Sequence, residues 1–150
     1  MILRGMHLDG FGLFHDYALD NLSPGLQVFL GPNEAGKTTL LAFLRRLFFG
    51  FPTKRGTNNQ YEPLGGGQHG GWVTVEARNG HVFRVERRPG PHGGPVTLVG
   101  PDDSQGDAGD WQRLLGSATQ ELFESVYAFG LGELQDFDTL SQEGIRNRIY

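Results

Sequence analysis

Residues 31–38 read Gly31-Pro32-Asn33-Glu34-Ala35-Gly36-Lys37-Thr38, which fits the pattern G-x-x-x-x-G-K-S/T of a phosphate-binding loop. Glycines let the backbone turn sharply and bring several N–H groups close to phosphate oxygens. The helix that follows such a loop points its positive end at the same place. The pattern therefore predicts that Lys37 reaches the β- and γ-phosphates of a nucleotide and that the Thr38 hydroxyl ligates Mg²⁺.

The flanks of this loop decide whether the match is meaningful, because the chain holds 24 glycines among 150 residues. An apolar run at residues 26–30 predicts a buried strand that enters the loop. Apolar residues then recur at helical spacing over residues 39–49, and Gly50 and Pro52 end that helix. Lys37 is the predicted catalytic residue. Strand, loop and helix together predict nucleotide binding by Gly31, Pro32, Asn33, Glu34, Ala35, Gly36, Lys37, Thr38 and Thr39.

Composition narrows the classes of protein that fit. The length predicts one domain, and 37% hydrophobic residues are enough for a real core. The absence of cysteine excludes disulfides, thiolate metal sites and cysteine nucleophiles, and it fits a reducing cytoplasm. No apolar run approaches the roughly 20 residues that cross a bilayer, so no membrane contact is expected. A net charge of −4 means that any contact with DNA must come from a local patch.

The rest of the chain predicts a mixed sheet that contains an antiparallel hairpin. Residues 72–88 carry the clearest pattern, with alternating apolar residues on both sides of the turn signal Asn79-Gly80. The glycine-rich run at residues 65–71 is interpreted as a flexible linker. Strands are expected at residues 2–9, 13–19, 72–77, 81–88 and 96–99.

Helical signals dominate the last third of the chain. Asp110 is the expected cap of a first short helix, and Ser117 with Gln120 forms a capping box for a second. Another capping box predicts a helix over residues 139–150, and neither glycine nor proline ends it. We therefore expect a fragment of a longer chain, cut inside a helix. The sequence reads as an acidic surface loop at 100–109, helices at 111–115 and 118–124, and a strand or buried turn at 125–129.

Part of a hydrolytic site is missing from the sequence. A phosphate-loop ATPase needs an acidic residue at the end of an apolar strand, and no run of four apolar residues here ends in Asp. The five histidines show no paired spacing typical of a metal site. Two basic groups are interpreted as solvated side chains rather than as contacts with DNA. The first, around the helix end, is Arg45, Arg46, Lys54 and Arg55, and the second, on the hairpin, is Arg84, Arg87 and Arg88.

A family pattern runs through six stretches of the chain: MILR at 1–4, DGFGLF at 9–14, PGLQVFLGPNEAGKTTLL at 24–41, FFGFP at 48–52, FRVER at 83–87 and VYAFGLGELQ at 126–135. Together these stretches resemble the amino-terminal half of the ATPase head of SMC, SbcC and RecF-type proteins. The last stretch, and the loop with its Pro-Asn-Glu-Ala core, are especially similar to the YhaN branch. The resemblance spans nearly the whole chain.

This resemblance implies an α/β fold, the N-terminal lobe of an ABC-type P-loop NTPase head. Residues 1–150 are then the N-terminal half of the head, and residues 139–150 begin a helix that leads to a coiled coil. In the family, the signature motif and the acidic strand with its catalytic Glu lie in the C-terminal half. Two heads dimerise around two molecules of ATP with Mg²⁺. Relatives act on DNA, often beside a metal-dependent nuclease, which implies a nucleoid-associated protein of DNA repair or chromosome maintenance.

Two positions depart from the family pattern. Many relatives place an arginine that approaches the phosphates where this chain has Gly12. They also place a glutamine that senses Mg²⁺ and the γ-phosphate at about Leu131, and Gln135, four residues on, is the candidate for that role here. The adenine contacts of the family would fall at residues 61–64.

Two rival functions stay open at this point. The first is a nucleotide-gated dimerisation module with negligible turnover. The second is a stand-alone P-loop kinase or GTPase, which would need an arginine-rich lid with an acceptor site or a guanine-reading motif such as N-K-x-D. Neither of those features is visible in the sequence.

Overall fold

The structure is a computed structural model that describes residues 1–52, 60–116 and 118–128. The chain divides into two units, Met1–Ser117 and Ala118–Tyr150. The phosphate loop and the predicted hairpin both lie in the first unit. Within the described ranges, no helix is long and apolar enough to cross a membrane.

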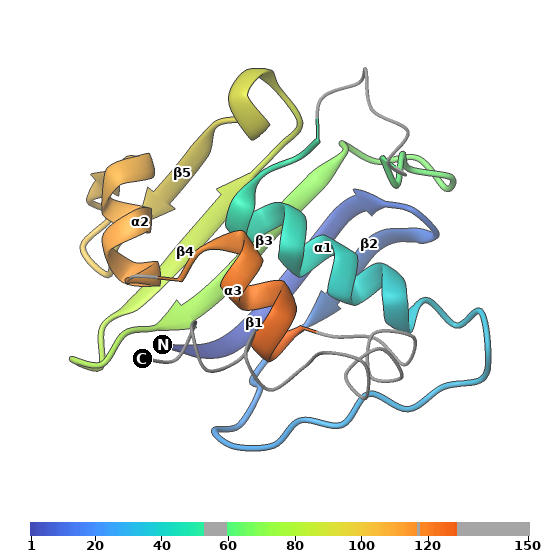
Figure 1. The fold of residues 1–150 in the computed structure, drawn as a ribbon, viewed down its shortest axis with the longest axis horizontal. Helices are drawn as coiled ribbons and strands as arrows, with labels where there is room; N and C mark the ends of the chain where they lie inside the picture. Colours follow the sequence, from blue (N-terminus) through green and yellow to red (C-terminus); the bar gives the residue numbers. More distant parts are fainter. Residues whose placement is uncertain (53–59, 117, 129–150) are drawn as a thin grey trace, which may run out of the picture. The chain divides into compact units, whose positions relative to one another are not determined.

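A six-stranded sheet forms the framework of the first unit (Figure 1). The strand order is β2-β1-β3-β4-β5-β6, every neighbouring pair is antiparallel, and Gly10 and His69 add an isolated parallel bridge. The predicted strands at 2–9, 13–19, 72–77, 81–88 and 96–99 are all present, whereas β6 lies in the stretch expected to be a surface loop. The strands are β1 (Ile2–Phe11), β2 (Phe14–Leu19), β3 (Gly70–Glu76), β4 (Val82–Arg87), β5 (Val96–Val99) and β6 (Gln105–Gly106).

The predicted hairpin is formed by β3 and β4. The Ala77 N–H donates to the His81 carbonyl at 2.8 Å, which closes the turn at Asn79-Gly80. The His81 N–H donates to Asn79 Oδ1 at 3.1 Å. The Gly80 N–H donates to the Ala77 carbonyl at 3.0 Å, and Gly80 adopts φ +81, the left-handed conformation that ends a three-residue hairpin loop.

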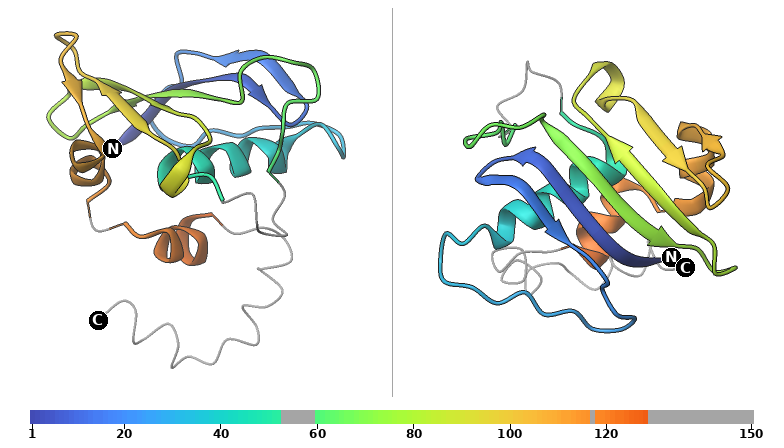
Figure 2. Two further views of the ribbon diagram at one scale, coloured as in Figure 1. Left: turned by 90° about the horizontal axis from the view of Figure 1, so that it is seen from above. Right: turned by 180° about the vertical axis from the view of Figure 1, so that it is seen from behind.

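One face of the sheet is covered by α1 (Lys37–Phe49), as the view from above shows (Figure 2). Side chains alternate along each strand, so that Val73 and Val75 of β3 are buried on one face. The helix contributes Phe43, which is fully buried, and its ring meets the ring of Phe11 edge-on at 5.4 Å. Each such side chain stabilises the fold by roughly 1.5–3 kcal/mol.

The far end of α1 is held by the short 3₁₀ turn η1 (Pro91–Gly93). Gly50 ends the helix at φ +111, as the sequence predicts, and the Phe51 N–H donates to the Gly93 carbonyl at 2.8 Å. A Cβ on Gly50 would lie 3.0 Å from the Gly93 Cα, so the two backbones meet without intervening side chains. The direction of α1 across the sheet is therefore fixed at its C-terminal end.

A second helix, α2 (Ala108–Leu115), is anchored by Trp111. The indole is 1% exposed and donates to the Phe48 carbonyl at 3.1 Å. The prediction that Asp110 caps this helix is wrong, because Asp107 is the N-cap and Asp110 lies inside the first turn. The two aspartates form a reciprocal capping box, in which the Asp107 N–H donates to the Asp110 carboxylate at 3.0 Å.

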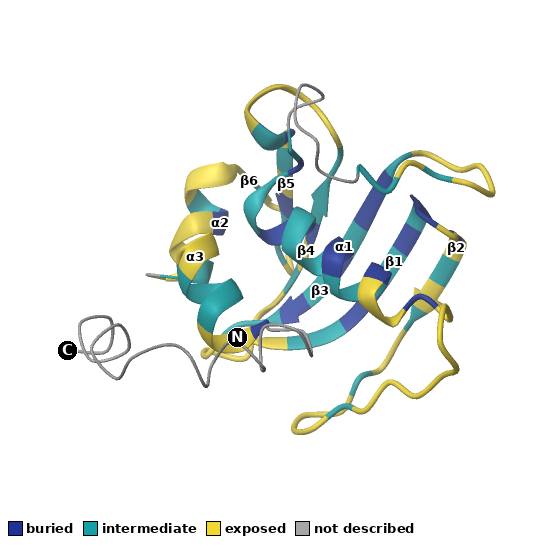
Figure 3. Ribbon diagram, turned by 45° about the vertical axis from the view of Figure 1, so that its right-hand side comes forward, coloured by how far each residue is buried: buried dark blue, intermediate teal, exposed yellow. Residues whose placement is uncertain are grey.

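The strand predicted at residues 26–30 is absent, and the segment is irregular. Leu26 and Leu30 are each 90% exposed, and Val28 is 66% exposed (Figure 3 shows this loop largely in yellow). A continuous apolar run is typical of a strand that is buried on both faces and paired on both sides. The described strands place no partner beside it, so the prediction is wrong for this chain taken alone.

The glycine-rich run at residues 65–71 is not the flexible linker that composition predicts. It lies directly against β1, and its last residues begin β3. A Cβ on Gly67 would lie 2.0 Å from the Asp9 carbonyl oxygen, and one on Gly71 would lie 2.1 Å from that of His7. The glycines therefore permit a close contact between two backbones.

The second unit begins with α3 (Gln120–Leu122), which continues into the π-helical turn η2 (Phe123–Tyr127). Thr119 is the N-cap, and its hydroxyl accepts an N–H of the first turn at 3.1 Å. Ser117, the predicted cap, lies outside the described residues. Over residues 125–127 the alternative of a strand is wrong, because the chain is helical there, and Phe129 lies outside the described residues.

Candidate nucleotide-binding site

The phosphate loop enters α1 through a left-handed glycine. Gly36 is the N-cap, with φ +90 and ψ 13, and Glu34 also has a positive φ of +68. The Ala35 N–H donates to the Pro32 carbonyl at 3.3 Å, and the Leu40 N–H donates to the Gly36 carbonyl at 2.9 Å. Two left-handed residues so close together curl the backbone into the concave turn that the motif predicts.

Lys37 folds back over the beginning of the loop. Its ammonium donates to the carbonyls of Gly31 and Pro32, both at 2.7 Å. An ammonium has three N–H donors, so these two bonds leave one for a further acceptor. The side chain is exposed and is held at the loop rather than extended into solvent.

The first turn of α1 is open to an anion. No side chain caps the N–H groups at this end, and the first turn contains no acidic residue. Uncapped N–H groups and the positive end of the helix favour phosphate. Thr38 is exposed beside them, whereas Thr39 is 9% exposed. Among the predicted binding residues 31–39, Gly36 and Thr39 are buried and the others are exposed.

The β1–β2 turn, residues 11–14, packs against the start of α1. A Cβ on Gly12 would lie 2.9 Å from Thr39 Cγ2, and Gly12 has φ +56. A larger residue therefore has no room here in the present backbone. The arginine expected here from the family resemblance would therefore clash with Thr39 in this backbone.

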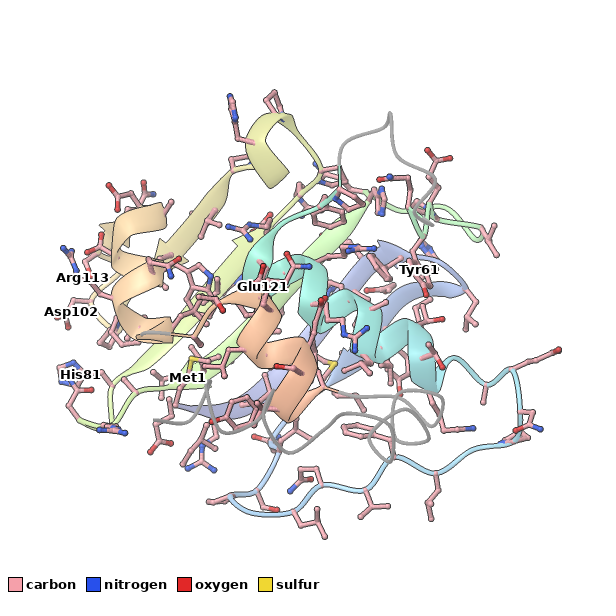
Figure 4. The ribbon with its side chains drawn as sticks, in the orientation of Figure 1. Met1, Tyr61, His81, Asp102, Arg113 and Glu121 are labelled. Atoms are coloured by element: carbon pink, nitrogen blue, oxygen red, sulfur yellow. The ribbon has the colours of Figure 1, made fainter. Side chains whose placement is uncertain are left out.

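The predicted adenine-side segment, residues 61–64, lies beside the same turn. The Gly12 N–H donates to the Tyr61 carbonyl at 2.8 Å, and the Leu64 N–H donates to the Gly12 carbonyl at 2.8 Å. The Tyr61 ring stacks on Phe11 at 5.1 Å, and Figure 4 shows Tyr61 at the closed end of the β1–β2 hairpin. The structure thus brings residues 61–64 near the phosphate loop, and their contact with a base stays a prediction.

Of the two predicted metal ligands, Thr38 and Gln135, the structure describes only Thr38. Thr38 lies at the loop, whereas Gln135 and Leu131 fall outside the described residues, as does the helix predicted at 139–150. Within the described ranges, no cluster of three or more His, Asp or Glu side chains could hold a metal ion.

One of the two basic groups, Arg84, Arg87 and Arg88, packs against the sheet; Lys54 and Arg55 of the other group lie outside the described residues. Arg88 forms ion pairs with Asp9 at 2.5 Å and with Glu86 at 2.8 Å. The Arg84 guanidinium lies 4.3 Å from the ring centroid of Trp72. Burial lowers the pKa of the Arg87 guanidinium, two of whose nitrogens are fully buried. The prediction of solvated side chains is therefore wrong for Arg87 and Arg88, which are partly buried against the sheet.

The histidine nearest the hairpin is also bound within the fold. His7 contacts Asp9 through Nδ1 at 2.8 Å and Asp16 through Nε2 at 3.0 Å. Its ring stacks on Trp72 with a centroid separation of 5.3 Å. These contacts tie β2 to the centre of the sheet.

Sequence reasoning missed the residues that support the loop from below. Phe14 packs under Gly36, and Gly12 packs under Thr39. A glycine between two phenylalanines, Phe11-Gly12-Leu13-Phe14, was a visible signal of a tight apolar turn. Its contact with the phosphate loop was not visible, because the two segments are separated in the chain.

Known proteins match this chain along nearly its whole length. A family model described as AAA domain matches residues 1–137. The uncharacterized protein YhaN of Bacillus subtilis (strain 168) is 30% identical over 141 residues, which are 93% of this chain and 14% of YhaN. A structure solved in work on "ATP-driven dimerization and DNA stimulated activation of SMC ATPases" has a TM-score of 0.63 at 13% identity, and covers 97% of this chain and 96% of that chain. The predicted fold is confirmed.

Proposed function

Because the chain belongs to the AAA domain family, we propose that it is the ATP–Mg²⁺-binding part of an SMC-like ATPase head. The observation that carries this proposal is the loop at the start of α1, where the Lys37 ammonium is bonded to two loop carbonyls and no side chain caps the helix. The resemblance to YhaN and the SMC-type fold support the same conclusion.

The chain's own residues would bind the phosphates in three ways. Uncapped backbone N–H groups at the loop and in the first turn of α1 would donate to phosphate oxygens. Lys37 supplies the positive charge, exchanging a bond to a loop carbonyl for one to the β- or γ-phosphate. Thr38 supplies a hydroxyl to Mg²⁺, and Gln135 is a second proposed ligand. Bound Mg²⁺ neutralises charge that develops on the phosphates during hydrolysis.

Hydrolysis is proposed to require the rest of a longer protein. The chain spans 14% of the length of YhaN, which leaves ample sequence for a C-terminal half with the signature motif and the acidic strand. The exposed apolar segment 26–30 supports this proposal, because its sequence suits a central strand and such a strand needs neighbours. We also propose that two such heads dimerise. The complete protein would act in DNA repair or chromosome maintenance, together with a nuclease.

Binding of a fluorescent ATP analogue with Mg²⁺ tests the loop directly. We expect measurable, weak binding by the chain, and a loss of at least about 10-fold in affinity for Lys37→Ala, since one charged hydrogen bond to phosphate is worth about 1.5–3 kcal/mol. Arg113→Ala is the matched control, because it removes one cation whose side chain is 78% exposed on α2. Equal affinities for the two variants would contradict the proposed site.

Turnover distinguishes an ATPase from a dimerisation module. We expect negligible hydrolysis by this chain, and hydrolysis when the C-terminal part is added or fused. Lys37→Ala in that assembly should abolish the gain. Binding and dimerisation without turnover in the complete protein would favour the nucleotide-gated module instead, and strong hydrolysis by the chain alone would contradict the split head.

A further inference from the structure

The left-handed glycine of the phosphate loop lies on an aromatic ring from another part of the chain. We propose that Phe14 is a positioning residue for the loop: its ring holds Gly36, and through it Lys37 and the start of α1, in the arrangement that binds phosphate. The inference rests on the proposed nucleotide function and deepens it. Phe14 itself touches no part of the nucleotide in this proposal.

The contact between Phe14 and Gly36 is close. A Cβ built on Gly36 would lie 2.6 Å from Phe14 Cζ and 2.8 Å from Cε2, and 3.2 Å from Leu13 Cδ2. The ring therefore packs against the bare backbone of the glycine. Gly36 is buried, whereas residues 31–35 are exposed, so the ring supports the loop at the residue just before Lys37.

The ring is itself held in place from two directions. Phe14 is the first residue of β2 and faces Phe11 across the hairpin, so the backbone ladder fixes its position relative to the sheet. The Tyr17 ring lies 4.7 Å from the Phe14 ring, on the same strand. Phe14 is 9% exposed, as expected of a side chain enclosed by these neighbours.

A second contact lies one helical turn further along. Gly12 of the same turn packs against the Thr39 methyl group, two residues after Lys37. The β1–β2 turn thus meets the loop and the first turn of α1 at successive points. Because the donors of a phosphate loop are backbone N–H groups, their directions depend on where this backbone rests.

Removing the ring should misplace these donors without removing any of them. Phe14→Ala leaves space under Gly36, and the loop loses the surface that sets its position. Displacements of the order of 1 Å in a binding constellation can weaken function by up to about 100-fold. We expect a loss of at least about 10-fold in affinity for a fluorescent ATP analogue with Mg²⁺.

Phe48→Ala provides a matched control. Phe48 is also a phenylalanine that is 9% exposed, and it packs against Trp111, with ring centroids 5.7 Å apart, near the other end of α1. Both variants should lose stability, so affinity is measured at a temperature where circular dichroism shows each one folded. Phe48→Ala should bind within about 2-fold of the wild type, and Phe14→Leu should recover most of the affinity that Phe14→Ala loses, since Leu refills most of the space.

The outcomes separate the two proposals. Equal losses for Phe14→Ala and Phe48→Ala, or wild-type affinity for Phe14→Ala, would overturn the positioning role while Lys37→Ala still confirms the site. If Phe14→Ala does not fold, Phe14→Val, which refills less of the space than Leu, takes its place, and wild-type affinity for that variant would overturn the role. Failure of the wild-type chain to bind, or binding unaffected by Lys37→Ala, would instead refute the nucleotide site.

Discussion

Replacing Gly12 by alanine tests how closely the β1–β2 turn is packed against α1. Two effects add at this position. Gly12 has φ +56, and a left-handed conformation costs about 1–2 kcal/mol for a residue with a Cβ. The new Cβ would also lie 2.9 Å from Thr39 Cγ2, and overpacking of this kind costs about 1–3 kcal/mol. We therefore expect the free energy of unfolding to fall by about 2–5 kcal/mol.

Urea unfolding, followed by circular dichroism, measures this loss. With a slope of about 1–3 kcal/mol per molar urea, the midpoint should fall by on the order of 1 M or more. Gly80→Ala is the control, because Gly80 has a similar φ of +81 and a Cβ added there would meet nothing within 4 Å. It should show the conformational cost alone, about 1–2 kcal/mol. Equal midpoints for the two variants would refute the reasoning, since the contact with Thr39 would then carry no energy.

Three further predictions concern other parts of the fold. The hydrogen bond from the Asp107 N–H lowers the pKa of Asp110. The ionised carboxylate therefore stabilises the fold above the unfolded pKa of about 3.9. That stabilisation is lost as the pH falls through the folded pKa. The difference in melting temperature between wild type and Asp110→Asn should therefore shrink from pH 6 to pH 3, and a constant difference would contradict this. Trp111→Ala should lower the free energy of unfolding by about 3–5 kcal/mol, because the indole is 1% exposed and packs against Phe48. A loss under about 1 kcal/mol in urea unfolding would be inconsistent with that packing. Leu30→Lys should change the free energy of unfolding by less than about 0.5 kcal/mol, because Leu30 is 90% exposed. A large loss of that free energy would show that the segment is covered in this chain.

Local signals predicted the parts of the fold that depend on local chemistry. The turn at Asn79-Gly80 needs a left-handed residue at Gly80, and the alternation on both sides fixes which faces are buried, so this hairpin was readable from the sequence. The cap of α2 was misplaced because Asp107 and Asp110 both suit an N-cap, and the reciprocal bonds between them decide which one begins the helix. The glycine run was misread because its role depends on β1, a segment distant in sequence.

The candidate site likewise contains residues that could be predicted from the sequence and residues that could not. The loop residues follow from the spacing of Gly31, Gly36 and Lys37, whose chemistry is contained within a single short stretch. The supporting residues Phe14 and Gly12 could not be assigned, because their partners are brought to them by the folding of the hairpin under α1. At residues 26–30 the sequence predicted a strand that the structure does not contain. Their pattern predicts a strand, but strand formation depends on neighbours that the described chain does not supply.

The contact between residues 65–71 and β1 has a consequence for engineering this protein. Glycine-rich stretches are usual places for insertions and labels, because most of them run free over the surface. Here an added residue or fluorophore at Gly67 would push the backbone off the Asp9 carbonyl and disturb β1. Tags are better placed at the turn around Gly80, where a side chain meets open space.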